Sequence, residues 1–208
     1  MLIPTWTRGA LIVVAGCALW LLLASPRQLF GWDTGPFGMA LLVASAWGLL
    51  YVVSRMSGED LQRSASPAEW KARIGAGFTA VAMVYFFAKL HILKDATLPH
   101  DPDANAVGRN LVLLLIAWLV LSEVLASRWK GAVEEDERDR EIAVRAAAWG
   151  RGALIFCIVG IAMLGFTPAD RLEWATPLMI GNLLIFALMW GWLCEYVATL
   201  AYYWRDRQ

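Results

Sequence analysis

Charge is scarce in this sequence, and the scarcity indicates the class of protein. Only 17% of the 208 residues are charged, against about a quarter in soluble proteins. Hydrophobic residues make up 59% of the chain, and its eighteen basic and eighteen acidic residues cancel. We therefore expect the lipid bilayer to surround most of the chain, and no nucleic-acid partner, because the basic surface that such a partner requires is missing.

Cysteine, histidine and catalytic motifs are also scarce. The cysteines Cys17, Cys157 and Cys194 lie in separate apolar runs without a Cys-x-x-Cys pair, a pattern that indicates neither a disulfide framework nor a zinc knuckle. The two histidines fall in one loop, so they cannot hold a haem across a bilayer. The sequence has no Gly-x-Ser-x-Gly elbow, phosphate-binding glycine loop or His-Glu-x-x-His motif. We identify no catalytic residue and predict no cofactor.

Long apolar runs are what the sequence has in abundance. A transmembrane helix needs about 20 predominantly apolar residues, with about 17 as the lower limit. Six stretches approach or meet this length: Gly9 to Ser25, Pro36 to Ser54, Ile74 to Leu93, Leu111 to Ser127, Gly152 to Pro168 and Pro177 to Tyr203. They predict an all-α integral membrane protein with six transmembrane helices arranged as three consecutive hairpins.

The basic residues predict the orientation of these helices. Thirteen of the eighteen Lys and Arg residues fall on one side of the predicted membrane and five on the other, which places both termini in the cytoplasm. Arg8 and the apolar run behind it also fit a signal peptide, and Val14 to Cys17 fits a lipoprotein cleavage box. Cleavage before Cys17 would leave an apolar stub and an odd number of helices, so we expect an uncleaved first helix.

An internal repeat is visible in the tryptophans. Trp47, Trp118 and Trp190 align without gaps, 71 and 72 residues apart, and each odd-numbered predicted helix begins with Trp, Arg and Gly in that order. Self-similarity at a fixed period marks a repeated structural unit. Within one transmembrane domain, 1–208, we predict parallel hairpin repeats over about 6–55, 70–127 and 149–204. Coincidental interfacial composition is the alternative, because Trp and Arg are common at membrane interfaces.

Two carboxylates occupy equivalent places in this repeat, Glu123 and Glu195. Carboxylates inside a bilayer are costly unless they are paired or hydrated. They form either a proton or cation site or structural ion pairs, with Arg73 and Arg151 at comparable depth as partners. Lys89, near the outer end of the third predicted helix, either contacts an anion or extends its ammonium to water.

The outer loop after the third predicted helix holds His91, Asp95, His100, Asp101 and Asp103. Imidazole and carboxylate groups are ligands for divalent transition metals. The loop is therefore a candidate metal site. An ordinary solvated loop is the alternative, because its two prolines suit such a loop and the spacing matches no metalloenzyme signature.

A highly charged segment, 134–148, precedes the fifth predicted span. Three of its acidic residues stand four positions before basic ones, in the pairs Glu134 and Arg138, Asp136 and Arg140, and Glu141 and Arg145, a spacing that stabilises a helix. We predict a charged helix that leads into the span, with Asp136, Glu137, Arg138 and Arg145 as candidate contacts for a protein partner. A solvated helix face is the alternative.

The same segment carries a resemblance. Asp136-Glu137-Arg138, then Ile142, then Arg145-Ala146 before an apolar run resembles a pattern in uncharacterised small bacterial integral membrane proteins with a domain of unknown function, over about 134–168. The resemblance implies a bacterial cytoplasmic (inner) membrane protein and no particular activity.

Three functions fit these features. The first is a non-catalytic regulator, sensor or accessory subunit that contacts a cytoplasmic or membrane protein through the charged helix. The second is a small proton- or ion-coupled transporter or channel that uses Glu195 and Glu123, as a homo-oligomer. The third is a metal-handling membrane protein or enzyme built on the loop from His91 to Asp103.

Overall fold

The computed structural model describes residues 13–14, 16–18, 20–21, 28–29, 32–54, 66–95, 101–129, 137–168 and 174–208. Five long helices run through this part of the chain: α2 (Thr34–Ser54), α4 (Pro67–Asp95), α5 (Pro102–Trp129), α6 (Glu137–Met163), which the 3-10 turn η1 (Leu164–Phe166) continues, and α7 (Pro177–Arg205). A two-residue antiparallel ladder of β1 (Gln28–Leu29) and β2 (Trp32–Asp33) precedes α2. Apart from this ladder, the regular structure of the described ranges is helical.

Four of the described helices are long and apolar enough to cross a membrane, namely α4, α5, α6 with η1, and α7. The 21 residues of α2 also provide the length that a span needs. These helices mark the chain as a membrane protein. Most of the first predicted span, Gly9 to Ser25, lies outside the described residues.

Several helices extend well beyond their predicted apolar spans. The 29 residues of α4 measure about 43 Å at a rise of 1.5 Å per residue, whereas the hydrocarbon core of a bilayer is about 30 Å thick.

Capping explains why α5 and α7 begin where they do. The Asp101 carboxylate accepts hydrogen bonds from the backbone N–H groups of Asp103 (2.9 Å) and Ala104 (3.3 Å), and the Thr176 hydroxyl accepts one from Met179 (3.2 Å).

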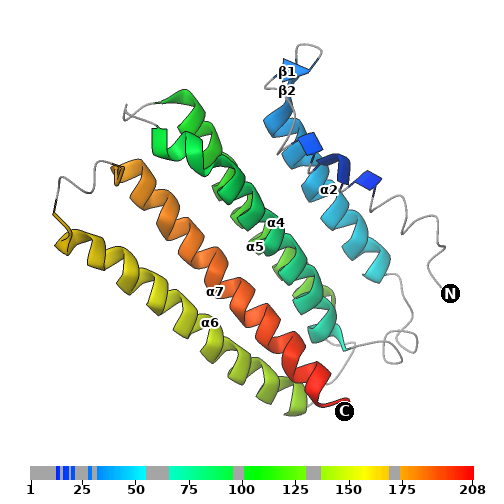
Figure 1. The fold of residues 1–208 in the computed structure, drawn as a ribbon. Helices are drawn as coiled ribbons and strands as arrows, with labels where there is room; N and C mark the ends of the chain where they lie inside the picture. Colours follow the sequence, from blue (N-terminus) through cyan, green and yellow to red (C-terminus); the bar gives the residue numbers. More distant parts are fainter. Residues whose placement is uncertain are drawn as a thin grey trace.

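The helices lie side by side with α4 at the centre (Figure 1). One side of α4 packs on α5, which in turn packs on α2, and another side packs on α7. The helix α6 packs on α7 at the edge of the bundle. Among the long helices described, α6 therefore has one main neighbour.

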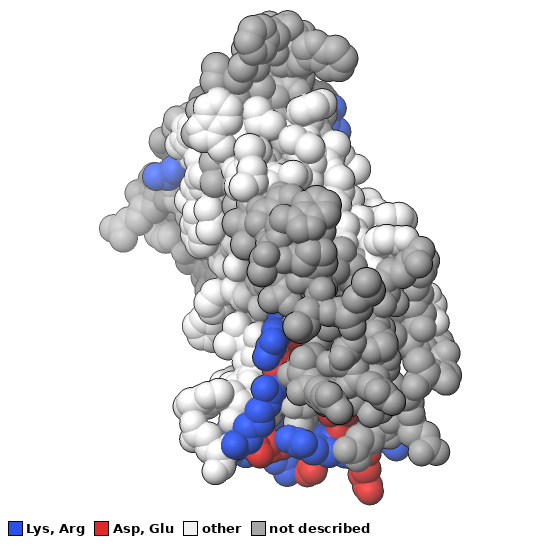
Figure 2. Space-filling model, turned by 90° about the vertical axis from the view of Figure 1, so that its right-hand side faces the viewer, with Lys and Arg blue, Asp and Glu red and all other residues white. Residues whose placement is uncertain are grey.

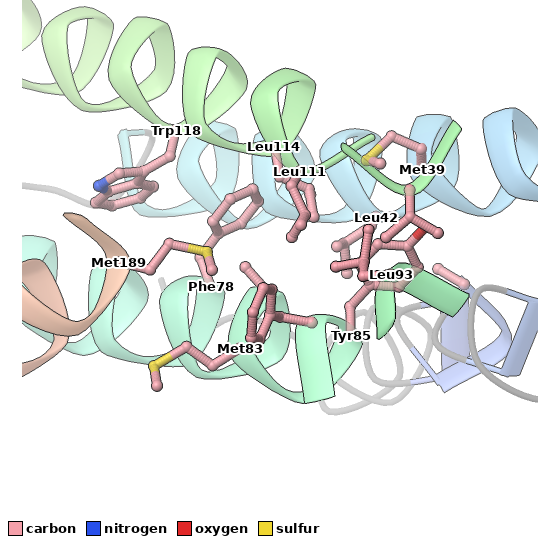
Figure 3. Close-up of a cluster of buried hydrophobic side chains, with 14 of the residues drawn as sticks. Met39, Leu42, Phe78, Met83, Tyr85, Leu93, Leu111, Leu114, Trp118 and Met189 are labelled. Carbon is pink, nitrogen blue, oxygen red and sulfur yellow. The ribbon is translucent and has the colours of Figure 1, made fainter. Parts of the chain in front are cut away.

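The core lies between α2, α4, α5 and α7. Figure 3 shows Phe78 and Met83 of α4 among side chains of the three neighbouring helices. The rings of Phe78 and Trp118 are stacked, with centroids 5.6 Å apart. This packing fixes the central pair of helices, α4 and α5, on which the outer helices rest.

Charged side chains gather at one end of the bundle. We call it the charged end: α4 and α6 begin there and α5 and α7 finish there (Figure 1). Figure 2 shows Lys and Arg beside Asp and Glu at the lower end of the molecule, below a belt of uncharged residues. This separation of charged and uncharged surface fits a helix bundle with its apolar length in lipid.

The three aligned tryptophans occupy different environments. Trp118 is buried in the core, whereas Trp47 and Trp190 are exposed. Positions that are equivalent in the predicted repeats therefore differ in burial. The repeat itself stays a prediction.

Candidate functional site

A buried carboxylate lies at the charged end. The side chain of Glu69, in the first turn of α4, is only 5% exposed. Its Oε1 accepts a hydrogen bond from Arg73 at 2.6 Å, and its Oε2 accepts one from Arg207, beyond the end of α7. The arginine side chains are 44% and 48% exposed. Glu69 therefore ties the start of α4 to the C-terminal residues while the cations keep contact with solvent.

Tyr203 connects the same region to α6. Its buried hydroxyl donates a hydrogen bond to the Asp139 carboxylate at 2.7 Å and accepts one from the Ser66 hydroxyl at 3.2 Å. Nearby, Arg138 and Asp206 form an ion pair at 3.1 Å. We call this set the end network: Ser66, Glu69, Arg73, Arg138, Asp139, Tyr203, Asp206 and Arg207. It fixes the ends of α4, α6 and α7 relative to one another.

The sequence alone does not identify Glu69 as a site residue, although it contains a local signal there. Ser66-Pro67-Ala68-Glu69 matches a capping box with proline at the first helical position. The Ser66 hydroxyl does accept a hydrogen bond from the Glu69 N–H at 3.3 Å. The Glu69 carboxylate, however, turns to the two arginines. The sequence indicates where the helix starts but not that the Glu69 carboxylate binds these arginines.

Glu195 lies at the crossing of α6 and α7. It is half-buried in α7, opposite Gly150 of α6. A Cβ atom on Gly150 would lie 2.9 Å from both the Glu195 Cβ and the Gly191 carbonyl oxygen, so the two backbones are nearly in contact here. Lys71 and Arg151 are the cations that act electrostatically on the carboxylate. Glu195 forms no ion pair with the residues that the structure describes.

The other predicted charges within the spans have different surroundings. Glu123 is exposed on α5, Arg151 is exposed on α6, and Lys89 is partly exposed on α4. Arg73 binds Glu69 rather than either of the predicted carboxylates. The equivalence of Glu123 and Glu195 in sequence therefore does not extend to their burial.

The predicted metal loop is described only in part. His91 is exposed on α4, and Asp101 caps α5. Across the ranges that the structure describes, no three His, Cys, Asp or Glu side chains form a group able to hold a metal ion. His100 and the side chain of Asp95 lie outside those ranges. The metal site stays a prediction.

The charged segment before the fifth predicted span is helical from Glu137 onward and continues into that span as α6, as predicted. The predicted pair of Glu141 and Arg145 is present at 2.6 Å. Arg138 binds Asp206 of the C-terminal residues. Asp136 lies outside the described residues. Glu137 is exposed in the first turn, so it is available to a partner.

A hydrogen bond from a buried tryptophan joins α5 and α7. The Trp118 indole N–H donates to the Tyr196 hydroxyl at 2.7 Å, with the rings edge to face. Gly75 of α4 provides the space, because a Cβ atom there would lie 2.7 Å from the Tyr196 ring and 2.8 Å from the Trp118 ring. The three central helices thus meet at one polar contact.

Removing this acceptor is expected to destabilise the protein. Tyr196→Phe leaves the buried indole N–H of Trp118 without its partner, which costs about 1–3 kcal/mol. The matched control is Tyr202→Phe, since the Tyr202 hydroxyl accepts from the exposed Trp149 indole at 3.2 Å, and its loss is expected to cost no more than about 0.5 kcal/mol. Reversible unfolding in detergent micelles measures both. Equal losses for the two variants would contradict the assignment.

Two open, largely apolar grooves lie on the described surface. One, of about 480 Å³, is on α6 and α7 and is lined by Ala148, Trp149, Gly152, Ala153, Phe156 and Cys194. The other, of about 880 Å³, lies between α2 and α5. Glu195 lines neither groove.

No protein-family model, curated protein or solved structure matches the chain. The assignment of function rests on the geometry described above.

Proposed function

We propose that the protein is a non-catalytic polytopic membrane protein, a regulator, sensor or accessory subunit that acts by binding another membrane protein through α6. In this proposal the chain crosses a bacterial inner membrane six times as three hairpins, with the charged end in the cytoplasm. The excess of basic residues on that side of the sequence and the gathering of charge at one end of the bundle support the orientation.

The exposure of α6 is the observation that carries the proposal. Only 6% of the apolar membrane-spanning stretch of α6 is buried within the protein, against 28% for α7 and 39% for α4 and α5. Its packed face runs through Ile142, Ala146 and Gly150. Leu154 also lies against Gly191 of α7, and most of the remaining surface of the helix is open to lipid or to another protein.

The open surface of α6 has the features of a helix-binding site. The 480 Å³ groove has Gly152 and Ala153 between the large side chains of Trp149 and Phe156. Small residues let a second transmembrane helix approach closely, and van der Waals packing then drives association. Towards the charged end, Glu137 and Arg140 are exposed and form no ion pair with described residues. They provide polar contacts where a partner helix leaves the membrane.

Photo-cross-linking in native membranes tests this surface. A photoreactive residue at position 156 is expected to give a discrete protein adduct, whereas one at the exposed Val112 of α5 gives lipid adducts only. Gly152→Leu fills the groove and is expected to abolish the adduct. Gly160→Leu is the matched control, because a Cβ atom added to either glycine meets nothing within 4 Å and only Gly152 lines the groove. Loss of the adduct in both variants, or no adduct at all, would refute the proposal.

Glu195 supports a second candidate function, a small proton- or ion-coupled transporter. The supporting observation is a half-buried carboxylate within a span that forms no ion pair with described residues, a costly arrangement that often marks an ion pathway. In proteoliposomes, this function requires a proton or cation flux that Glu195→Gln abolishes and Glu123→Gln reduces. Equal leakage from wild-type, variant and empty vesicles would exclude it.

A further inference from the structure

The groove between α2 and α5 combines apolar walls with one cation. Met39 and Trp47 lie along its α2 side, and Arg109 and Ala117 lie along its α5 side. Arg109 is the charged residue of the lining. A guanidinium group beside an apolar groove is the arrangement that an amphipathic anion would fit.

Arg109 lies within a span and has no protein partner in the described part of the chain. The span of α5 runs from Pro102 to Val124, so Arg109 is about 10 Å along it at 1.5 Å per residue. No hydrogen bond or ion pair joins its exposed side chain to a described residue. A charge at that depth is costly unless it extends to the interface or is paired. A phosphate would pair with it, since guanidinium binds phosphate through two parallel hydrogen bonds.

The groove lies at the depth of the lipid acyl chains. Arg109 and Ala117 on α5 are eight positions apart in sequence, as are Met39 and Trp47 on α2, which is about 12 Å along each helix. Half of the hydrocarbon core is about 15 Å. Because Arg109 already lies about 10 Å along the 23-residue span of α5, the groove runs from there to the middle of the membrane and a few ångströms beyond it, at the depth where an acyl chain ends.

A second polar group lies beside the cation. Asn110 also lines the groove, and its amide donates a hydrogen bond to the buried Tyr85 hydroxyl of α4 at 3.2 Å. The contact with α4 fixes the Asn110 side chain. The polar end of the groove is therefore held by the core of the bundle.

We infer that this groove binds an anionic phospholipid, with the phosphate on Arg109 and one acyl chain between α2 and α5. The inference is independent of the partner surface on α6. An anionic lipid is favoured over a zwitterionic one. In phosphatidylethanolamine, the ammonium group of the lipid competes with Arg109 for the phosphate of the same lipid molecule.

Native mass spectrometry of the delipidated full-length protein tests the inference with two probes, phosphatidylglycerol and phosphatidylethanolamine of the same acyl composition. Phosphatidylglycerol is expected to bind more tightly. Arg109→Gln is expected to weaken its binding about tenfold, as for the loss of one charge-assisted contact. Arg109→Lys retains part of the affinity, and Ala40→Trp, which fills the groove, weakens both lipids.

Lys94→Gln is the control, because Lys94 is an exposed cation in the last turn of α4 and does not line the groove. It is expected to leave phosphatidylglycerol binding unchanged. The inference is overturned if Lys94→Gln weakens binding as much as Arg109→Gln does, or if Arg109→Gln and Ala40→Trp both bind lipid like the wild type. A change in oligomer mass with unchanged lipid binding would assign the groove to a second copy of the chain and overturn it as well. Circular dichroism identifies variants that are folded.

Discussion

Replacing Gly150 by valine is expected to force α6 away from α7 and to destabilise the protein by about 1–3 kcal/mol, the usual range for overpacking a tight contact. The cost cannot be relieved by a rotamer change alone, because the new Cβ atom would lie 2.9 Å from the Gly191 carbonyl oxygen, a backbone atom. The free energy of unfolding, measured by titration from mild detergent into denaturing detergent, checks the expectation.

Gly160→Val is the matched control for this experiment. Gly160 lies on the same helix, and a Cβ atom there has nothing within 4 Å. The same gain in volume is expected to change the stability by no more than about 0.5 kcal/mol. If valine at 150 and at 160 had equal effects, the loss would come from the helix itself and not from the crossing with α7.

The Gly150 contact also bears on the proposed function. Among the described elements, α6 is attached mainly to α7 and, at the charged end, through Asp139 and Arg138 of the end network. Moving α6 changes the position of its open surface relative to the bundle. Gly150→Val should therefore also reduce photo-cross-linking from position 156, and Gly160→Val should leave it unchanged.

Glu69→Gln is expected to have the second large effect, a loss of about 1.5–3 kcal/mol, the range for hydrogen bonds to charged groups. The substitution keeps the shape of the side chain but removes the charge that Arg73 and Arg207 share. The arginines are half exposed and regain water, so the cost stays below that of leaving a fully buried charge unpaired. Release of the C-terminal residues is expected in addition, measured as faster digestion by carboxypeptidase.

Glu141→Gln provides a control with the same local geometry. Glu141 and Arg145 form an i, i+4 pair at 2.6 Å, as do Glu69 and Arg73, but the Glu141 side chain is 63% exposed. An exposed pair of this kind contributes less than about 1 kcal/mol. Equal effects of the two substitutions would show that burial and the Arg207 contact add nothing to the Glu69 pair.

What the sequence by itself determined is local in character. Uninterrupted apolar length marks helices able to cross a membrane, since about 30 Å of hydrocarbon demands about 20 apolar residues. The spacing of Glu141 and Arg145 predicted both a helix and a contact within it, because residues four apart lie on one helix face. The spacing of charges predicts the helical start of α6, and the apolar length that follows predicts its span.

Tertiary structure alone decided the contacts that hold the bundle together. Ser66 and Tyr203 are 137 residues apart in sequence, Glu69 and Arg207 are 138 apart, and Tyr203 and Asp139 are 64 apart. No periodicity in the sequence predicts such pairs, because they depend on which faces of which helices meet. The predicted charges show the same limit. Arg73 binds Glu69, a carboxylate that the apolar runs of the sequence do not indicate. The aligned residues Glu123 and Glu195 differ in burial, because Glu123 is exposed on α5 whereas the close crossing of α6 and α7 at Gly150 covers Glu195.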